Sequence, residues 1–367
     1  MPMVTVLDES GRLDEAGQRA AVRHVVQDGY GADVIFAAGT TGEWDRLPPE
    51  TNRRVVALCA EEVAKLNVAV VARGAGGNER AVEVWAGVTA PTPEETLENL
   101  DFAISHPGVE AAVLAPLSIR GIEDPVRFVA RDVADLLDAR PRRIPIFLYD
   151  NADIAVNPEV PHMHTKQVKA LSRLDFVRGI KVSAPPKVLG NYRRAAANFR
   201  ERGEFAIYVG DALQIFDIFR PAQGLIGVLG DYWRRWKLAG ALPSGVVAGP
   251  ANALPREWAR AWQVCRAGDL ERMEEVRGVL EAFRNGTRAA GGRRTIACLK
   301  RALVRLGVTR SDAVAPGTPA LSRPDAERFD ESFARVRELA RGRIRPPWVT
   351  RGPVDEAGLP AASEARS

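Results

Sequence analysis

Short apolar segments alternate along the chain with longer segments of helical character. Several of the short segments are continuous runs of Val, Ile, Leu and Ala, which is typical of parallel strands that are buried on both faces. Eight strands are predicted in this way: Met3–Leu7, Val34–Ala38, Val82–Val88, Ala111–Ala115, Ile144–Tyr149, Val177–Val182, Ala206–Val209 and Gly245–Ala248.

Helices are predicted between these strands, and several of them begin with Pro, which suits the first helical turn. Because strand and helix alternate eight times, the pattern predicts an α/β fold, specifically a (β/α)8 TIM barrel rather than an open sheet. The predicted helices are Glu15–Gln27, Pro49–Lys65, Pro93–Ser105, Pro125–Asp138, Lys166–Ser172, Pro186–Arg202 and Leu213–Phe219.

The chain is longer than a minimal barrel. We expect a catalytic barrel over residues 1–255, a helical extension over 256–342, and a disordered tail over 343–367, which is rich in Pro, Gly, Ala and Ser. The additional helices are predicted at Arg256–Arg266, Leu270–Asn285, Thr295–Leu306 and Asp325–Gly342.

Two stretches look like insertions into the barrel. Residues 67–79 contain the apolar run Val68–Ala72, which predicts an inserted hairpin or a misplaced strand. Residues 221–243 contain the segment Asp231–Lys237 (DYWRRWK), whose aromatic and basic side chains suit either a subunit contact or a lid over an anionic ligand, with the contact favoured. In residues 74–77 (GAGG), a flexible turn is favoured over a dinucleotide site, because the acidic residue and helix of such a site are missing.

Composition excludes several classes of protein. Hydrophobic residues make up 46% and charged residues 27% of the 367 residues, so the chain can bury a large core without disulfides. The net charge of +4 is spread along the chain, which does not indicate a nucleic-acid partner. No apolar run approaches the roughly 18 residues of a membrane span. The widely spaced Cys59, Cys265 and Cys298 favour a reduced, cytoplasmic setting.

The first candidate for chemistry is Gly39–Glu43 (GTTGE), which directly follows a predicted strand. Glycine permits a tight turn, and backbone N–H groups with two hydroxyls could hold a small carboxylate or phosphate. An ordinary strand-to-helix turn, with Glu43 in a capping role, is an equally good interpretation of this pattern.

Two further candidates lie in predicted strands. Lys181 interrupts an apolar strand, and burial favours the neutral amine, the nucleophile that forms a Schiff base with a ketone. Its alternative is a lysine at a strand end that reaches solvent. Tyr149 ends another strand, where a phenol could transfer protons at the mouth of a barrel; its alternative is a core tyrosine bonded to backbone. His162 and His164 form a weaker H-x-H pair, interpreted as loop residues rather than metal ligands, and no metal is expected.

In their order and spacing, Gly39–Glu43, Tyr149, Gly179–Lys181 and Gly245–Pro255 resemble the dihydrodipicolinate synthase / N-acetylneuraminate lyase family of class I aldolases. The resemblance extends over most of the chain. It implies a (β/α)8 barrel with extra C-terminal helices, a homo-oligomer (dimer or tetramer), a small 2-oxo acid as substrate, and no cofactor.

The same resemblance implies roles for individual residues. Lys181 would form the Schiff base with pyruvate or another 2-oxo acid, and Tyr149 and Thr40 would relay protons. Thr41, together with Gly39, would hold the substrate carboxylate. Val247 would contribute a backbone carbonyl near the lysine.

The chain departs from the family at two places. Dihydrodipicolinate synthases carry a tyrosine pair where Leu117 and Ser118 stand here, and an arginine for the second carboxylate of the substrate about where Ile154 stands. We therefore expect an aldolase-type lyase that makes or breaks a C–C bond but is not a true dihydrodipicolinate synthase. The alternatives are a sugar-acid dehydratase that uses the same lysine, and a catalytically inactive barrel that serves as a binding or scaffold subunit.

Overall fold

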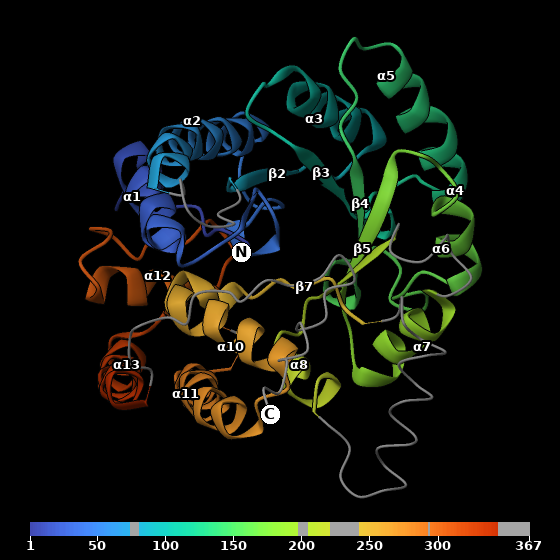
Figure 1. Cartoon of the computed structure of the whole chain (residues 1–367). Coiled ribbons are helices and arrows are strands. Elements are labelled where there is room, and N and C mark those ends of the chain that lie inside the picture. The colour runs from blue at the N-terminus through green and yellow to red at the C-terminus, as the bar shows by residue number, and fades with distance from the viewer. Residues whose placement is uncertain (74–80, 197–204, 221–241, 293, 344–367) are drawn as a thin grey trace, which may run out of the picture.

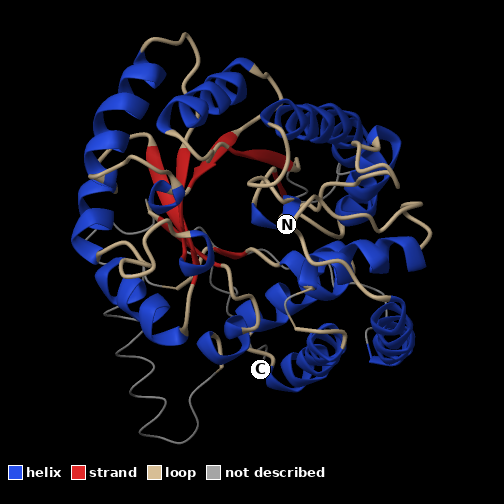
Figure 2. Cartoon of the chain, turned by 180° about the vertical axis from the view of Figure 1, so that it is seen from behind, coloured by secondary structure: helices blue, strands red, loops and turns tan. Residues whose placement is uncertain are grey.

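A parallel sheet forms the centre of the computed structural model, which describes residues 1–73, 81–196, 205–220, 242–292 and 294–343. Each strand pairs with the next one along the chain, and helices surround the sheet (Figure 2). The strands are β1 (Val34–Ala37), β2 (Glu83–Gly87), β3 (Ala111–Leu114), β4 (Ile146–Asn151), β5 (Val177–Ser183), β6 (Ala206–Val209) and β7 (Gly245–Val246).

The sheet is strongly curled, because side chains from strands that are not neighbours meet on its inner face. The ring centroid of Trp85 on β2 lies 4.0 Å from that of Phe147 on β4 and 5.4 Å from that of Tyr208 on β6. These rings belong to an inner cluster that also holds smaller apolar side chains. Its buried members are Phe36, Trp85, Ala111, Val113, Ala115, Phe147 and Tyr149. The predicted α/β fold is confirmed, and the curled parallel sheet is consistent with a TIM barrel.

The helices between the strands follow the predicted positions closely. Capping explains where several begin: Asp14 accepts a hydrogen bond from the N–H of Gly17 at the start of α1, and Thr92 precedes Pro93 at the start of α3. These helices are α1 (Glu15–Val26), α2 (Pro49–Arg73), α3 (Pro93–Ser105), α4 (Pro125–Phe128), α5 (Ala134–Asp138), α6 (Thr165–Leu171), α7 (Pro186–Ala196) and α8 (Gln214–Ile218).

Four further helices, orange to red in Figure 1, gather on one side of the sheet. The rings of Phe283, Phe329 and Phe333 join two of them, with centroid separations of 5.7–6.1 Å. The four helices are α10 (Pro255–Ala267), α11 (Leu270–Ala289), α12 (Thr295–Arg305) and α13 (Arg323–Arg343). The predicted C-terminal helices are therefore present, each within a few residues of its expected bounds.

The prediction that Met3–Leu7 forms the first strand is wrong. Its beginning does lie beside β1, since the N–H of Met3 donates to the carbonyl of Phe36 at 2.9 Å. Beyond that point, side-chain amides form hydrogen bonds with the backbone N–H groups that strand pairing would otherwise use. Asn252 accepts from the N–H of Val4, and Gln18 accepts from the N–H of Val6. Seven of the eight predicted strands are thus present in the described part of the chain.

The predicted hairpin or extra strand at Val68–Ala72 is also wrong. Helix α2 continues through this run to Arg73, because no Pro or Gly interrupts the sequence after Pro49 before residue 74. The side chain of Asn67 fixes this part of the helix to the start of β2 through two hydrogen bonds to the backbone of Val82, at 2.8 and 2.9 Å.

Several sequence predictions fall outside the described residues: the GAGG turn at 74–77, the Asp231–Lys237 segment and the tail from 344 onward.

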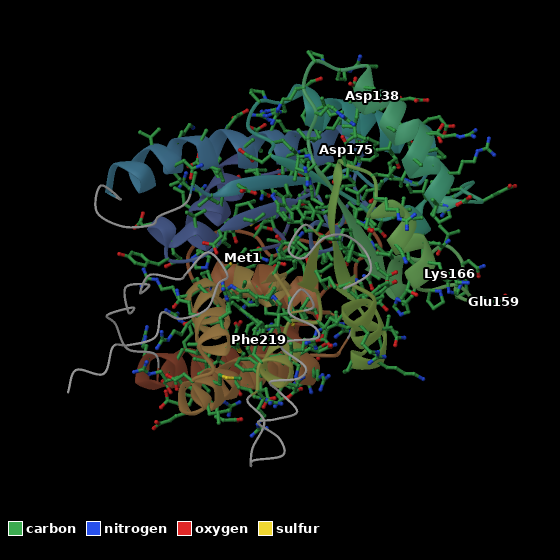
Figure 3. All side chains as sticks on the ribbon, turned by 45° about the vertical axis from the view of Figure 1, so that its right-hand side comes forward. Met1, Asp138, Glu159, Lys166, Asp175 and Phe219 are labelled. Atoms are coloured by element: carbon green, nitrogen blue, oxygen red, sulfur yellow. The ribbon has the colours of Figure 1, made fainter. Side chains whose placement is uncertain are left out.

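None of the described helices is long and apolar enough to cross a membrane. The three cysteines are free and buried. In Figure 3, Asp175, which precedes β5, is labelled in the upper part of the view, and Glu159, in the segment between β4 and α6, is labelled at the right.

The close approach of β2 to the loop after β1 generates the first prediction. A Cβ atom on Gly87 would lie 2.2 Å from the carbonyl oxygen of Ala38, the residue before Gly39. We expect Gly87→Ala to lower the free energy of unfolding by about 1–3 kcal/mol, as overpacking does. The matched control is Gly190→Ala in α7, where the nearest atom is 3.5 Å away. Equal stability of the two variants in urea unfolding would contradict this prediction.

Candidate active site

Lys181 lies within β5 with its side chain on the inner face of the curled sheet. It is 8% exposed, so the alternative of a lysine that reaches solvent is wrong. Its Nζ lies 3.7 Å from the ring centroid of Tyr149 and 5.0 Å from that of Phe36. The faces of aromatic rings attract a cation, which partly offsets the cost of burying the amine.

Tyr149 is the partner of Lys181 in the β4–β5 ladder. Its phenolic oxygen accepts hydrogen bonds from the Nδ2 of Asn151 at 2.9 Å and from the Oγ1 of Thr40 at 3.4 Å. Burial alone would raise the pKa of this phenol. The charge of Lys181 and hydrogen bonds from Thr40, Ser183 and Lys181 outweigh burial and hold the pKa of the phenol below its ordinary value. Such a phenol is well suited to donate and accept protons.

The loop after β1 carries the two threonines as a short 3-10 turn, Thr40–Gly42. Thr5 donates from its hydroxyl to the carbonyl of Gly42 at 2.7 Å, which fixes the turn. A Cβ atom on Gly39 would lie 2.6 Å from the ring of Phe36, so glycine is required where the loop crosses this ring. The loop therefore lies directly beside the rings of Phe36 and Tyr149, whose faces lie next to the amine of Lys181.

Thr41 and Val247 belong to loops that meet over the same end of the sheet. The Oγ1 of Thr41 would lie 3.4 Å from a Cβ atom built on Gly249, so the loop after β7 passes close to this hydroxyl. Val247 packs against the inner cluster that contains Tyr149. The structure thus brings Lys181 and Thr40 each into contact with Tyr149 and places Thr41 and Val247 nearby.

Glu43 stands at the C-terminal cap of the turn Thr40–Gly42, but its side chain is buried in an ion pair. Its Oε2 lies 2.5 Å from the Nζ of Lys300 on α12, and its Oε1 accepts from the N–H of Ala315 at 2.8 Å. Burial lowers the pKa of Lys300, although the charge of Glu43 opposes this shift. Both Glu43 and Ala38 adopt positive φ, 61° and 52°, so the loop is held in a conformation that costs energy.

His162 and His164 lie in different surroundings. The Nδ1 of His162 lies 2.8 Å from Oδ2 of the buried Asp150, whereas His164 is the N-cap residue of α6. Asp150 points to the opposite face from Tyr149, and burial raises its pKa. The part of the chain that the structure describes holds no group of three or more His, Cys, Asp or Glu that could bind a metal ion.

The sequence analysis missed four residues that build this site: Phe36, Asn151, Ser183 and Lys300. Asn151 and Ser183 are ladder partners, each two residues after a recognised candidate. Because side chains two apart in a strand share a face, this spacing could have identified both. Lys300 comes from a distant segment, and only the three-dimensional fold brings it to the loop. Phe36 precedes the loop directly, but only the curl of the sheet brings it to Lys181.

The Glu43–Lys300 pair generates the second prediction. Lys300→Met leaves a buried carboxylate without its partner, and we expect it to lower the free energy of unfolding by about 3–5 kcal/mol. The double variant Glu43→Gln, Lys300→Met removes both charges and should recover most of this loss. Urea unfolding of the single variants and the double variant measures the coupling free energy between Glu43 and Lys300. If their losses in the free energy of unfolding were strictly additive, this prediction would be contradicted.

Comparisons with known proteins agree with this geometry. The model of the dihydrodipicolinate synthetase family matches residues 1–87. A 4-hydroxy-tetrahydrodipicolinate synthase of Bartonella bacilliformis is 33% identical over 129 residues, 33% of this chain, so the match spans less than half, 43%, of that relative. The corresponding enzyme of Hyphomonas neptunium is 25% identical over 326 residues, 89% of this chain and 92% of the relative.

Solved structures show the same fold at lower identity. A prophage protein of the dihydrodipicolinic acid synthase family from E. coli K12, solved in complex with pyruvate, has a TM-score of 0.68 and 18% identity over 92% of this chain and 97% of its own. The sialic acid aldolase of Ruminococcus gnavus has a TM-score of 0.70 and 16% identity over 94% and 97%. The resemblance inferred from the sequence is therefore confirmed: the family model, a relative matched over nearly its whole length and the solved structures all support the dihydrodipicolinate synthase / N-acetylneuraminate lyase family, at low sequence identity.

Proposed function

We propose that the protein is a class I lyase of the aldolase type, in which Lys181 forms a Schiff base with pyruvate or another small 2-oxo acid. One observation carries this proposal: a buried lysine amine lies 3.7 Å from the ring of a tyrosine whose hydroxyl is bonded to Thr40. The resemblance to a family of lyases supports the general class of reaction. No cofactor is needed, because the protonated imine itself accepts electrons.

The proposed reaction uses each residue for one task. The Nζ of Lys181 adds to the keto carbon, and loss of water gives the iminium. Cleavage of a bond at the carbon next to the iminium carbon leaves its electron pair in an enamine, whereas formation of that bond uses the electron pair of the enamine to attack the partner carbonyl. Tyr149, linked to Thr40, transfers the protons that these steps need. Thr41 and Gly39 hold the carboxylate of the 2-oxo acid, and Val247 directs a carbonyl toward the lysine.

We further propose that the curled sheet is closed into a barrel by the first residues of the chain. Pro2 and Val4 bond to Asn252, which follows β7, at 2.7 and 3.2 Å. On its other side this segment reaches β1, through the hydrogen bond from Met3 to Phe36. Asn252 thereby provides the link that a ladder would otherwise make.

The aldehyde partner is proposed to lack a second carboxylate that needs a cation. Ile154, in the turn after β4, packs against the inner cluster beside Tyr149. An apolar side chain there favours a neutral group and gives no hydrogen bonds to a carboxylate. We therefore propose that this protein does not condense pyruvate with aspartate semialdehyde, although its curated relatives are named 4-hydroxy-tetrahydrodipicolinate synthases.

The third prediction tests the Schiff base directly. Borohydride reduction in the presence of pyruvate should attach the reduced pyruvate to Lys181, as measured by mass spectrometry of the intact protein and of its peptides. Lys181→Met should abolish the adduct, whereas the matched control Lys187→Met, on the neighbouring α7, should keep it. An unchanged mass, or an adduct on another lysine, would overturn the proposed function and favour a binding or scaffold role.

The fourth prediction concerns the partner aldehyde. We expect negligible condensation of pyruvate with aspartate semialdehyde by the wild-type protein. Ile154→Arg should raise it by about tenfold or more, because a hydrogen bond to a charged group is worth about 1.5–3 kcal/mol. Ile154→Met serves as the control of equal polarity. Robust condensation by the wild type in a coupled assay would show that Ile154 does not exclude this substrate.

A further inference from the structure

The phenolic oxygen of Tyr149 receives a hydrogen bond from Asn151, a residue to which the proposed function gives no task. Asn151 is the last residue of β4 and lies two positions after Tyr149, so both side chains stand on the inner face. Its Nδ2 lies 2.9 Å from the phenolic oxygen, a shorter contact than the 3.4 Å to Thr40.

The orientation of the Asn151 amide is fixed by its other end. Its Oδ1 accepts a hydrogen bond from the N–H of Asp153 at 3.1 Å, where the chain leaves β4 for the short 3-10 turn Ala152–Ile154. A carboxamide oxygen cannot donate, and the nitrogen cannot accept, so this contact leaves the NH2 group facing Tyr149. Asn151 therefore always presents a donor to the phenol.

A fixed donor changes the ionisation of the phenol. A phenolic oxygen accepts hydrogen bonds as well as donating one, and Asn151 donates to it alongside Thr40. A donor also stabilises the phenolate more than the phenol, because hydrogen bonds to a charged oxygen are the stronger ones.

We propose that Asn151 is a positioning residue that holds the Tyr149 oxygen beside Lys181 and favours its anionic form. The use of this anionic form in proton transfer rests on the proposed function. The effect on the ionisation of Tyr149 does not, so the two can fail separately.

The experiment follows the titration of Tyr149 by NMR of protein labelled with 13C at tyrosine Cζ. The chain has five tyrosines, and Tyr149→Phe identifies the signal. Two variants are used. Asn151→Asp keeps the oxygen that caps the turn but loses the donor, and Asn151→Leu loses both. The titration midpoint of Tyr149 should rise by about one to two pH units in both variants.

The matched control is Asn157→Leu. Asn157 accepts from the N–H of Glu159 at 2.9 Å, the same type of cap in the same loop, but on an exposed segment. Its removal should leave the Tyr149 midpoint unchanged. An unchanged midpoint in Asn151→Asp, or an equal rise in the Asn157 control, would overturn the proposal. If borohydride traps no pyruvate in the wild type while the midpoint still rises, the proposed function fails and the role of Asn151 in ionising Tyr149 stands.

Discussion

The structure depends above all on a lysine amine held inside a curled apolar sheet. The cost of burying Lys181 is offset by the faces of Tyr149 and Phe36, which come from β4 and β1. Because β1 and β5 are not neighbours in the sheet, this contact exists only when the sheet is curled. The same curvature brings Thr40 to Tyr149, so the fold and the candidate site are two consequences of one arrangement.

The loop after β1 shows how such a site is kept in place. Ala38 and Glu43 have positive φ, which for residues other than glycine costs roughly 1–3 kcal/mol each. This cost is tolerated because the loop is fixed from several directions: by Thr5 near the N-terminus, and by Lys300 on a C-terminal helix. The helices beyond the sheet thus contribute to the geometry of the site, although they supply none of the groups proposed to react.

The sequence allowed a good prediction of whatever depends on local pattern. Seven strands and the helices between them follow from continuous apolar runs and capping residues. For Lys181 the pattern gave a buried amine as one of two alternatives, and the structure decides between them. Met3–Leu7 was mispredicted because the amides of Gln18 and Asn252 compete for its backbone, a contact that no local pattern reveals. The pairing of Glu43 with Lys300 was missed for the same reason, since the two residues lie far apart in the chain. Asn151 could have been predicted from the two-residue period of a strand, because it lies two positions after Tyr149, but it was overlooked.

The central claim is that Lys181 and Tyr149 together activate the carbon next to the keto group of pyruvate. The most direct measurement is the exchange of the methyl protons of pyruvate for deuterium in D2O, followed by NMR, because it needs no knowledge of the partner aldehyde. The account predicts exchange with the wild type, none with Lys181→Met, and exchange about 10²- to 10³-fold slower with Tyr149→Phe. Absence of exchange with the wild type, or wild-type exchange without Lys181, would contradict it.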